Sequence, residues 1–271
     1  MREIDSADAY CRLLATGHYE NFAVASRIVP AQTRTHLMRF YAFCRTTDDL
    51  GDESGAPHIA LERLRSWREQ TQAFFAGAAP VHPVFIALRE TVERFGLDSA
   101  PFLDLIAANE QDQQVLSYRN WPALRAYCLL SAAPVGRVVL RFFNAAGERS
   151  EMLSDDVCIG LQLANHAQDV LRDAAIGRSY LLQDDVESGG TAFAVRSLTD
   201  RARMLLDSGR ELERLVPGAL RAQLALYRLG GVAICEEIER LGYRTDVRRP
   251  FVSNGTKMQL LLRTLVNVAS R

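Results

Sequence analysis

The fold of this chain is decided by the stretch FYAFCRTTDDLGDE, residues 40–53. Apolar residues recur there at helical spacing, at Leu37, Phe40, Tyr41 and Cys44. A Ser-Gly-Ala-Pro turn at residues 54–57 then ends the pattern, which predicts a helix with four carboxylates in its last turns. A helix C-terminus carries partial negative charge, so the carboxylates repel both it and one another. This imbalance predicts a bound cation.

Two of the acids have the spacing of a metal site. Asp48 and Asp52 stand four apart on one helical face, which places their Cβ atoms about 5–6 Å apart and suits a bridging divalent cation. Only Arg45 lies one turn upstream to offset the charge. The alternative is a solvated acidic helix end.

A second stretch, GLQLANHAQDVLRD at residues 160–173, repeats the arrangement. Asp169 and Asp173 are again four apart, and Asn165 lies one turn before them. If the two helices face each other, carboxylates and one amide form an all-oxygen set that suits Mg²⁺, with Mn²⁺ as the alternative ion. Substrate phosphates usually complete such sites, so we expect a diphosphate site. The candidate phosphate contacts are Arg45, Arg172 and Arg178.

Composition indicates an ordinary globular protein. The chain has 271 residues, 48% hydrophobic and 24% charged, without a linker-like stretch, and we expect one domain over residues 1–271. A net charge of −1 gives no reason to expect a nucleic-acid partner. Five dispersed cysteines, no signal peptide and no apolar run of membrane-spanning length favour a cytoplasmic protein, with the inner face of the membrane as the alternative.

Helical periodicity predominates, which predicts an all-α bundle. The expected helices are Ser6–Ala15, Ala31–Glu53, Ile59–Ala76, Pro83–Phe95, Pro101–Leu116, Pro122–Ala145, Ser154–Ala175, Ala194–Leu215, Ala219–Leu241 and Thr256–Ala269. Pro134 predicts a kink inside the sixth of them. The polar segment Leu182–Phe193 predicts a loop that could cover the site.

Other chemistries lack their motifs. A di-iron bundle needs Glu-x-x-His pairs, and the sequence has none. The five histidines are too scattered for a zinc site. The sequence contains no Gly-x-Gly-x-x-Gly motif, which would support nucleotide binding, and no Gly-x-Ser-x-Gly motif, which would support nucleophilic hydrolysis.

With YAFCR before the first acidic cluster and GRSYL at residues 177–181 after the second, the chain resembles the squalene/phytoene synthase family from about residue 8 onward. This resemblance implies an isoprenoid-synthase bundle around a central cavity, Mg²⁺ and C15 or C30 isoprenoid diphosphate substrates. The segments ATGHYENFAVAS (residues 15–26), SAAPVGR (131–137) and GGVAI (230–234) are similar to the bacterial hydroxysqualene synthases of the hopanoid pathway. Those enzymes ionise presqualene diphosphate, rearrange the cation and quench it with water, without NADPH. The resemblance also implies functional hand-off with a presqualene diphosphate synthase and a flavin-dependent squalene-forming oxidoreductase.

The resemblance implies roles for individual residues. The metal ligands would be Asp48, Asp52, Asn165, Asp169 and Asp173, and the catalytic set would be the four aspartates with Tyr127. The substrate contacts would be His18, Tyr41, Arg45, Gln162, Gln168, Arg178, Arg249 and Lys257. The aromatic residues that could stabilise a carbocation are Phe22, Phe40, Tyr41, Phe43 and Tyr127, of which we expect about two to line the cavity. The chain departs from the family at Leu182, His166 and Ala167.

Two alternatives stay open. One is head-to-head condensation of two farnesyl diphosphates to presqualene diphosphate, squalene or dehydrosqualene, which uses the same metal site. The other is a catalytically silent helical assembly factor of the same fold. Such factors tend to lose motif acids, and both motifs are complete here.

Overall fold

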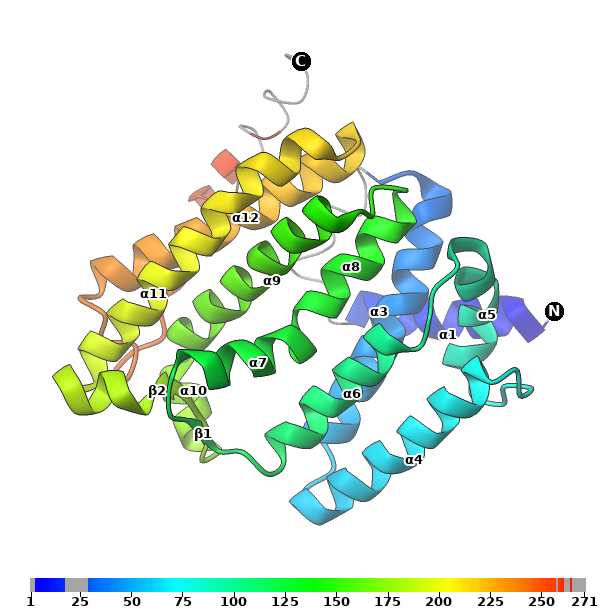
Figure 1. The fold of residues 1–271 in the computed structure, drawn as a ribbon, viewed down its shortest axis with the longest axis horizontal. Coiled ribbons are helices and arrows are strands. Elements are labelled where there is room, and N and C mark those ends of the chain that lie inside the picture. Colours follow the sequence, from blue (N-terminus) through cyan, green and yellow to red (C-terminus); the bar gives the residue numbers. More distant parts are fainter. Residues whose placement is uncertain (1–2, 18–28, 257, 261–263, 265–271) are drawn as a thin grey trace. The chain divides into compact units, whose positions relative to one another are not determined.

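The computed structural model describes residues 3–17, 29–256, 258–260 and 264, and these are almost entirely helical (Figure 1). The all-α prediction is confirmed. The chain forms two compact units, Met1–Gln114 with Arg137–Ala146, and Val115–Gly136 with Gly147–Arg271. We refer to them as the first and second units.

The described residues of the first unit include five long helices. They are α1 (Glu3–Gly17), α3 (Ala31–Asp52), α4 (Pro57–Phe75), α5 (Pro83–Phe95) and α6 (Ala100–Asp112). Helix α3 packs against each of the other four. Phe43 of α3, fully buried, stacks on Trp67 of α4 and meets Phe102 of α6 edge to face. Phe40 and Phe43, two of the aromatic residues proposed for the cavity wall, therefore lie in the aromatic core of this unit.

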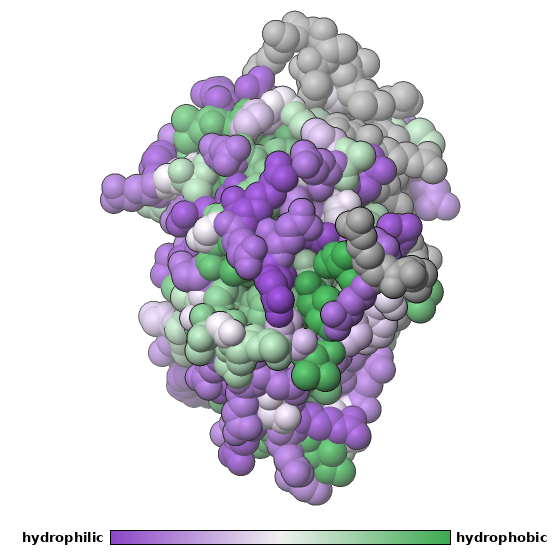
Figure 2. All heavy atoms as spheres, turned by 90° about the vertical axis from the view of Figure 1, so that its right-hand side faces the viewer, coloured by the Kyte–Doolittle hydropathy of each residue, from purple (hydrophilic) through white to green (hydrophobic). Residues whose placement is uncertain are grey.

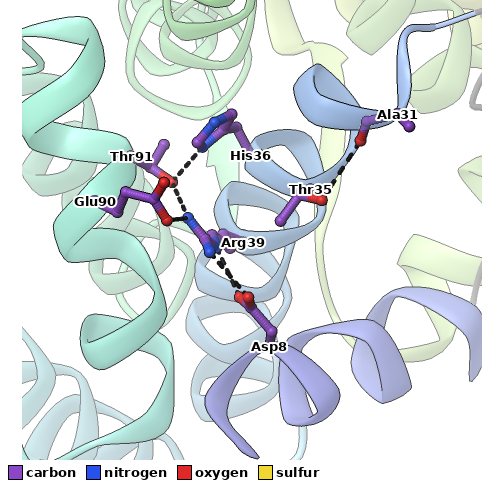
Figure 3. Close-up of polar contacts among 7 residues, drawn as sticks. All are labelled: Asp8, Ala31, Thr35, His36, Arg39, Glu90 and Thr91. Carbon is purple, nitrogen blue, oxygen red and sulfur yellow. Dashed lines mark hydrogen bonds and ion pairs between the residues drawn. The ribbon is translucent and has the colours of Figure 1, made fainter. Parts of the chain in front are cut away.

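A polar cluster around the buried Arg39 connects α1 and α5 to α3 (Figure 3). The Arg39 guanidinium is 3% exposed and forms ion pairs with Asp8 of α1 at 2.7 Å and with Glu90 of α5 at 2.8 Å. Thr91 lies at its centre, 3.4 Å from Arg39 and 2.9 Å from the His36 Nδ1 atom. One charged side chain thus connects three helices.

The second unit contains a three-helix core and a short parallel sheet. Among its described residues up to Arg240, it contains α7 (Trp121–Ser131), α9 (Glu148–Gln168), α10 (Val170–Ala175), α11 (Gln183–Leu215) and α12 (Gly218–Arg240). Strands β1 (Ser117–Tyr118) and β2 (Ser179–Leu182) pair in parallel. Helices α9, α11 and α12 lie side by side (Figure 1). A Cβ at Gly160 would lie 3.1 Å from the Ala202 carbonyl oxygen, so glycine permits the close approach of α9 and α11.

Two of the expected helices are each divided in the structure. The expected helix Pro122–Ala145 is divided at Ala132 into α7 and α8 (Ala133–Phe142), which places Pro134 in the first turn of α8, where a missing N–H group costs little. The expected helix Ser154–Ala175 begins earlier, at Glu148, and breaks at Asp169.

The expected loop Leu182–Phe193 is instead the first part of helix α11. Gly190 has φ 78° and ψ −178°, so this residue marks a kink within the helix. The prediction that this segment is a loop covering the site is therefore wrong. Of the expected helix Thr256–Ala269, the described residues 256, 258–260 and 264 are helical.

One apolar stretch has the length and composition of a membrane span. It covers Trp121–Phe142, with a mean hydropathy of 1.4 in its most apolar window. The break at Ala132 interrupts it, and 44% of that window is buried. Because a buried core helix passes the same test, the stretch is weak support for a membrane span.

The molecular surface mixes polar and apolar residues. Figure 2 shows one face, on which apolar side chains lie among polar ones. Val81 is 90% exposed and Leu13 is 71% exposed. Exposed apolar residues of this kind are common in folded proteins and do not by themselves identify a partner.

Candidate active site

The first acidic motif ends helix α3, as its sequence predicts. Glu53 caps the helix through a backbone hydrogen bond to the Asp49 carbonyl, and α3 has no basic residue in its last turn. Arg45 forms ion pairs with Asp49 at 2.5 Å and with Glu53 at 3.1 Å. Asp49 and Glu53 are therefore the ion-pair partners of Arg45, and Asp48 and Asp52 are the two acids that the sequence analysis assigned to metal binding.

Asp48 is held by a residue that the sequence analysis missed. The Asn109 side-chain amide of α6 donates to the Asp48 carboxylate at 3.2 Å and to the Leu105 carbonyl at 3.1 Å. Asp48 keeps contact with solvent, but the protein surrounding its carboxyl group partly desolvates it and raises its pKa to about 6. The hydrogen bond from Asn109 opposes this rise, and the charge of Asp52 adds to it.

Tyr41 is half-buried and lies almost two helical turns before Asp48. Desolvation raises the pKa of its phenol, Arg45 lowers it, and the charge of Asp48 raises it again. The hydroxyl group is therefore held in its neutral form, in which it can donate a hydrogen bond to an anion.

The second acidic motif lies at a helix break. Asp169 caps α9 with φ −99° and ψ 14°, and its carbonyl accepts the Asp173 backbone N–H at 2.9 Å. Asn165 is exposed, while Asp169 and Asp173 are half-buried. The Arg178 backbone N–H also donates to the Asp173 carbonyl, at 2.9 Å, which brings Arg178 beside this motif.

Two predicted substrate contacts, Arg249 and Gln168, meet the second motif directly. Arg249 donates from Nε to one oxygen of Asp169 and from a terminal nitrogen to the other at 3.4 Å. The same nitrogen donates to the Gln168 side-chain oxygen at 3.2 Å. The Gln168 side-chain nitrogen donates to the Pro250 carbonyl at 2.8 Å. Both ends of the buried Gln168 amide thus hold the segment that carries Arg249.

An aromatic stack lies next to this motif on the same unit. His166 of α9 stacks on Tyr180 of β2 with 3.7 Å between ring centroids, and Tyr180 packs on Tyr127 of α7 and Tyr118 of β1. Burial lowers the pKa of His166 to about 3, so its imidazole is neutral and pairs with Gln162 at 3.2 Å. Tyr127 is therefore part of a buried aromatic cluster, and the His166 ring, at a position where the chain departs from the family, belongs to the same cluster.

His18, Phe22 and Lys257 lie outside the described residues. Arg172, a candidate phosphate contact, is exposed on α10. Asn109 and Tyr118 were missed because nothing in their local sequence links them to an acidic motif. Tyr180 belongs to the quoted GRSYL segment, so that signal could have identified it.

The donor chemistry of both motifs fits a hard divalent cation. Carboxylate and amide oxygens are the ligands that Mg²⁺ and Mn²⁺ prefer. Within the described part of the chain, no group of three or more His, Cys, Asp or Glu side chains is arranged to hold an ion. Each unit supplies one acidic motif, and their joint binding of a metal stays a prediction.

Comparisons with known proteins identify the family. The family model "Squalene/phytoene synthase" matches residues 15–256. The phytoene synthase of Arthrospira platensis is 30% identical over 94% of this chain and 92% of its own length. The hydroxysqualene synthase of Zymomonas mobilis is 33% identical over 85% of this chain and 76% of its own length.

A solved structure supports the same assignment. Squalene synthase HpnC from Alicyclobacillus acidocaldarius has a TM-score of 0.83 to this structure and 42% sequence identity, covering 92% of this chain and 97% of that chain. The fold is the all-α isoprenoid-synthase fold, and the chain belongs to the squalene/phytoene synthase family.

Proposed function

We propose that this chain is a Mg²⁺-dependent hydroxysqualene synthase that converts presqualene diphosphate to hydroxysqualene and diphosphate. The observation that carries the proposal is the set of contacts at the end of α3, where Arg45 forms ion pairs with Asp49 and Glu53 and Asp48 instead accepts a hydrogen bond from the neutral Asn109 side chain. The similarity to hydroxysqualene synthases and to squalene synthase HpnC favours this reaction within the family.

The protein's own residues would perform distinct steps. The acids of both motifs and Asn165 would hold Mg²⁺, which when bound neutralises the leaving diphosphate. Arg45 and Arg178 would bind phosphate oxygens. The carbon–oxygen bond of the substrate breaks with its electron pair on diphosphate, and the aromatic faces of Tyr127 and Tyr180 would stabilise the cation. A water oxygen then bonds to the rearranged carbon, and its proton passes to the released diphosphate.

The second candidate is condensation of two farnesyl diphosphates. The similarity to phytoene synthase favours it, because that relative matches 94% of this chain and the hydroxysqualene synthase of Zymomonas mobilis matches 85%. A silent assembly factor receives no support, since both acidic motifs are complete. We propose a cytoplasmic location, with the inner membrane face as the alternative, and functional hand-off to a flavin-dependent squalene-forming oxidoreductase.

Product analysis by mass spectrometry tests the reaction. Purified protein with Mg²⁺ and no nicotinamide cofactor receives presqualene diphosphate in one reaction and farnesyl diphosphate in another. Hydroxysqualene from presqualene diphosphate alone is the expected result. A C30 product from farnesyl diphosphate would instead identify a condensing enzyme.

Matched substitutions test the metal assignment. Asp48→Asn and Asp169→Asn should each lower turnover by more than about 100-fold, because each removes a charged ligand. Asp49→Asn, at the neighbouring position paired with Arg45, should lower it far less. Near-wild-type turnover in Asp48→Asn and Asp169→Asn would exclude these residues as essential metal ligands.

A further inference from the structure

The Arg249 guanidinium and the Asp169 carboxylate form a two-point contact between residues 80 positions apart. The Asp169 side chain is 17% exposed and the Arg249 side chain is 37% exposed. Both oxygens of Asp169 accept hydrogen bonds from Arg249. A partly buried, two-point contact of this kind is geometrically specific.

Three further contacts keep Arg249 in this position. Gln168, which is 6% exposed, accepts from Arg249 and donates to the Pro250 carbonyl. The guanidinium also lies over the Phe251 ring, 5.2 Å from its centroid. The cation is therefore held at Asp169 by its neighbours in sequence and by the last residue of α9.

The two acidic motifs differ in the acid that receives an arginine. In the first motif, Arg45 forms its ion pairs with Asp49 and Glu53. In the second motif, Arg249 engages Asp169 itself, the residue expected to bind the metal. The protein thus supplies its own cation at one proposed metal ligand.

We propose that Arg249 is a resident counter-ion of Asp169, which a divalent cation must displace, and that Gln168 is the positioning residue that keeps it there. This inference rests on the proposed function, because it assumes that Asp169 is a metal ligand. A metal ion and the guanidinium require the same carboxylate oxygens, so their binding is competitive. Arg249 therefore lowers the affinity of Asp169 for the metal until the ion is present in sufficient concentration.

Binding of Mn²⁺ alone, without isoprenoid, tests the competition. Electron paramagnetic resonance of free Mn²⁺ would give the dissociation constant for the full chain and for Arg249→Gln. Removing the counter-ion should tighten binding by about twofold to fivefold, the size expected from a partly exposed ion pair. Arg248→Gln removes an exposed neighbouring charge and should leave the affinity unchanged. Unchanged or weaker binding in Arg249→Gln would overturn the proposal.

A second variant tests the positioning role of Gln168 separately from the role of Arg249. Gln168→Met retains Asp169 and Arg249, and it should tighten Mn²⁺ binding by a smaller factor. An unchanged affinity there would overturn the positioning role of Gln168. This variant also tests the competition if Arg249→Gln fails to fold.

Asp169→Asn distinguishes failure of this inference from failure of the proposed function. If this variant binds Mn²⁺ as the wild type does, Asp169 is not a metal ligand and both proposals fail there. If it binds Mn²⁺ more weakly while Arg249→Gln shows no tightening, the metal site stands and only the counter-ion role is excluded.

Discussion

The Asn109 side chain of α6 donates a hydrogen bond to the Asp48 carboxylate of α3 at 3.2 Å. Asn109 is itself oriented by a second bond to the Leu105 carbonyl, so the amide is fixed before it meets the acid. Because α6 and α3 belong to the same unit, this contact sets the orientation of Asp48 within a single packed structure. A neutral residue thereby controls one of the proposed metal ligands.

Asn109→Ala tests this control. Without the donor, the Asp48 carboxylate loses its fixed orientation and the interaction that lowers its pKa, so a proton competes better with a metal. We expect the Mg²⁺ concentration for half-maximal diphosphate release to rise by about tenfold or more at neutral pH. Gln114→Ala, later in the same chain segment, serves as the control. Equal Mg²⁺ dependence in both variants would exclude the role of Asn109.

Gly51→Ala probes the same contact from the backbone. A Cβ at Gly51 would lie 2.7 Å from the Asn109 side-chain oxygen, so the amide must move. Alanine normally stabilises a helix interior by about 1 kcal/mol relative to glycine, and we expect the clash to cancel that gain. Chemical denaturation would show the gain restored when Gly51→Ala is combined with Asn109→Ala. Stabilisation by Gly51→Ala alone would show that Asn109 moves without cost.

The Asp8, Arg39 and Glu90 cluster should dominate the polar contribution to the stability of the first unit. Arg39→Met leaves the partly buried Asp8 without its ion-pair partner, and we expect a loss of about 3 kcal/mol in unfolding free energy. Arg149→Met breaks an exposed pair with Glu211 and should cost less than about 1 kcal/mol. Urea denaturation of both variants measures the difference. Similar losses would show that burial of Arg39 does not determine its contribution.

The sequence predicts features that depend on local pattern. Apolar spacing and the turn after Glu53 place the end of α3 within one residue. The polar segment Leu182–Phe193 was misread as a loop, because its Gly189-Gly190 pair lies at a kink within α11 and does not end the helix. Asn109 and Asp48 are 61 residues apart, and Arg249 and Asp169 are 80 apart. Such tertiary pairs leave no periodic signal, so the acids of the site could be predicted but their partners could not.

Buried His166 should make the protein less stable in acid. Its pKa is lowered from 6.5 to about 3 by burial, so between these values the unfolded chain binds a proton that the folded chain does not. The contribution of neutral His166 to the free energy of unfolding is fully present above pH 6.5. It decreases as the pH falls, and about 2 kcal/mol is lost at pH 5. Urea denaturation of the wild type at pH 7.5 and pH 5 would measure this loss.

His166→Phe should reduce that dependence on pH, because phenylalanine can keep the stack on Tyr180 without a titratable ring. It also loses the hydrogen bond to Gln162, so its stability at pH 7.5 should be slightly lower. Burial lowers the pKa of His36 and His82 as well, so part of the slope should remain. His58→Gln changes an exposed histidine and should retain the wild-type slope. If His166→Phe also retained it, the acid sensitivity would have to originate in other groups, because the variant has no titratable ring at this position.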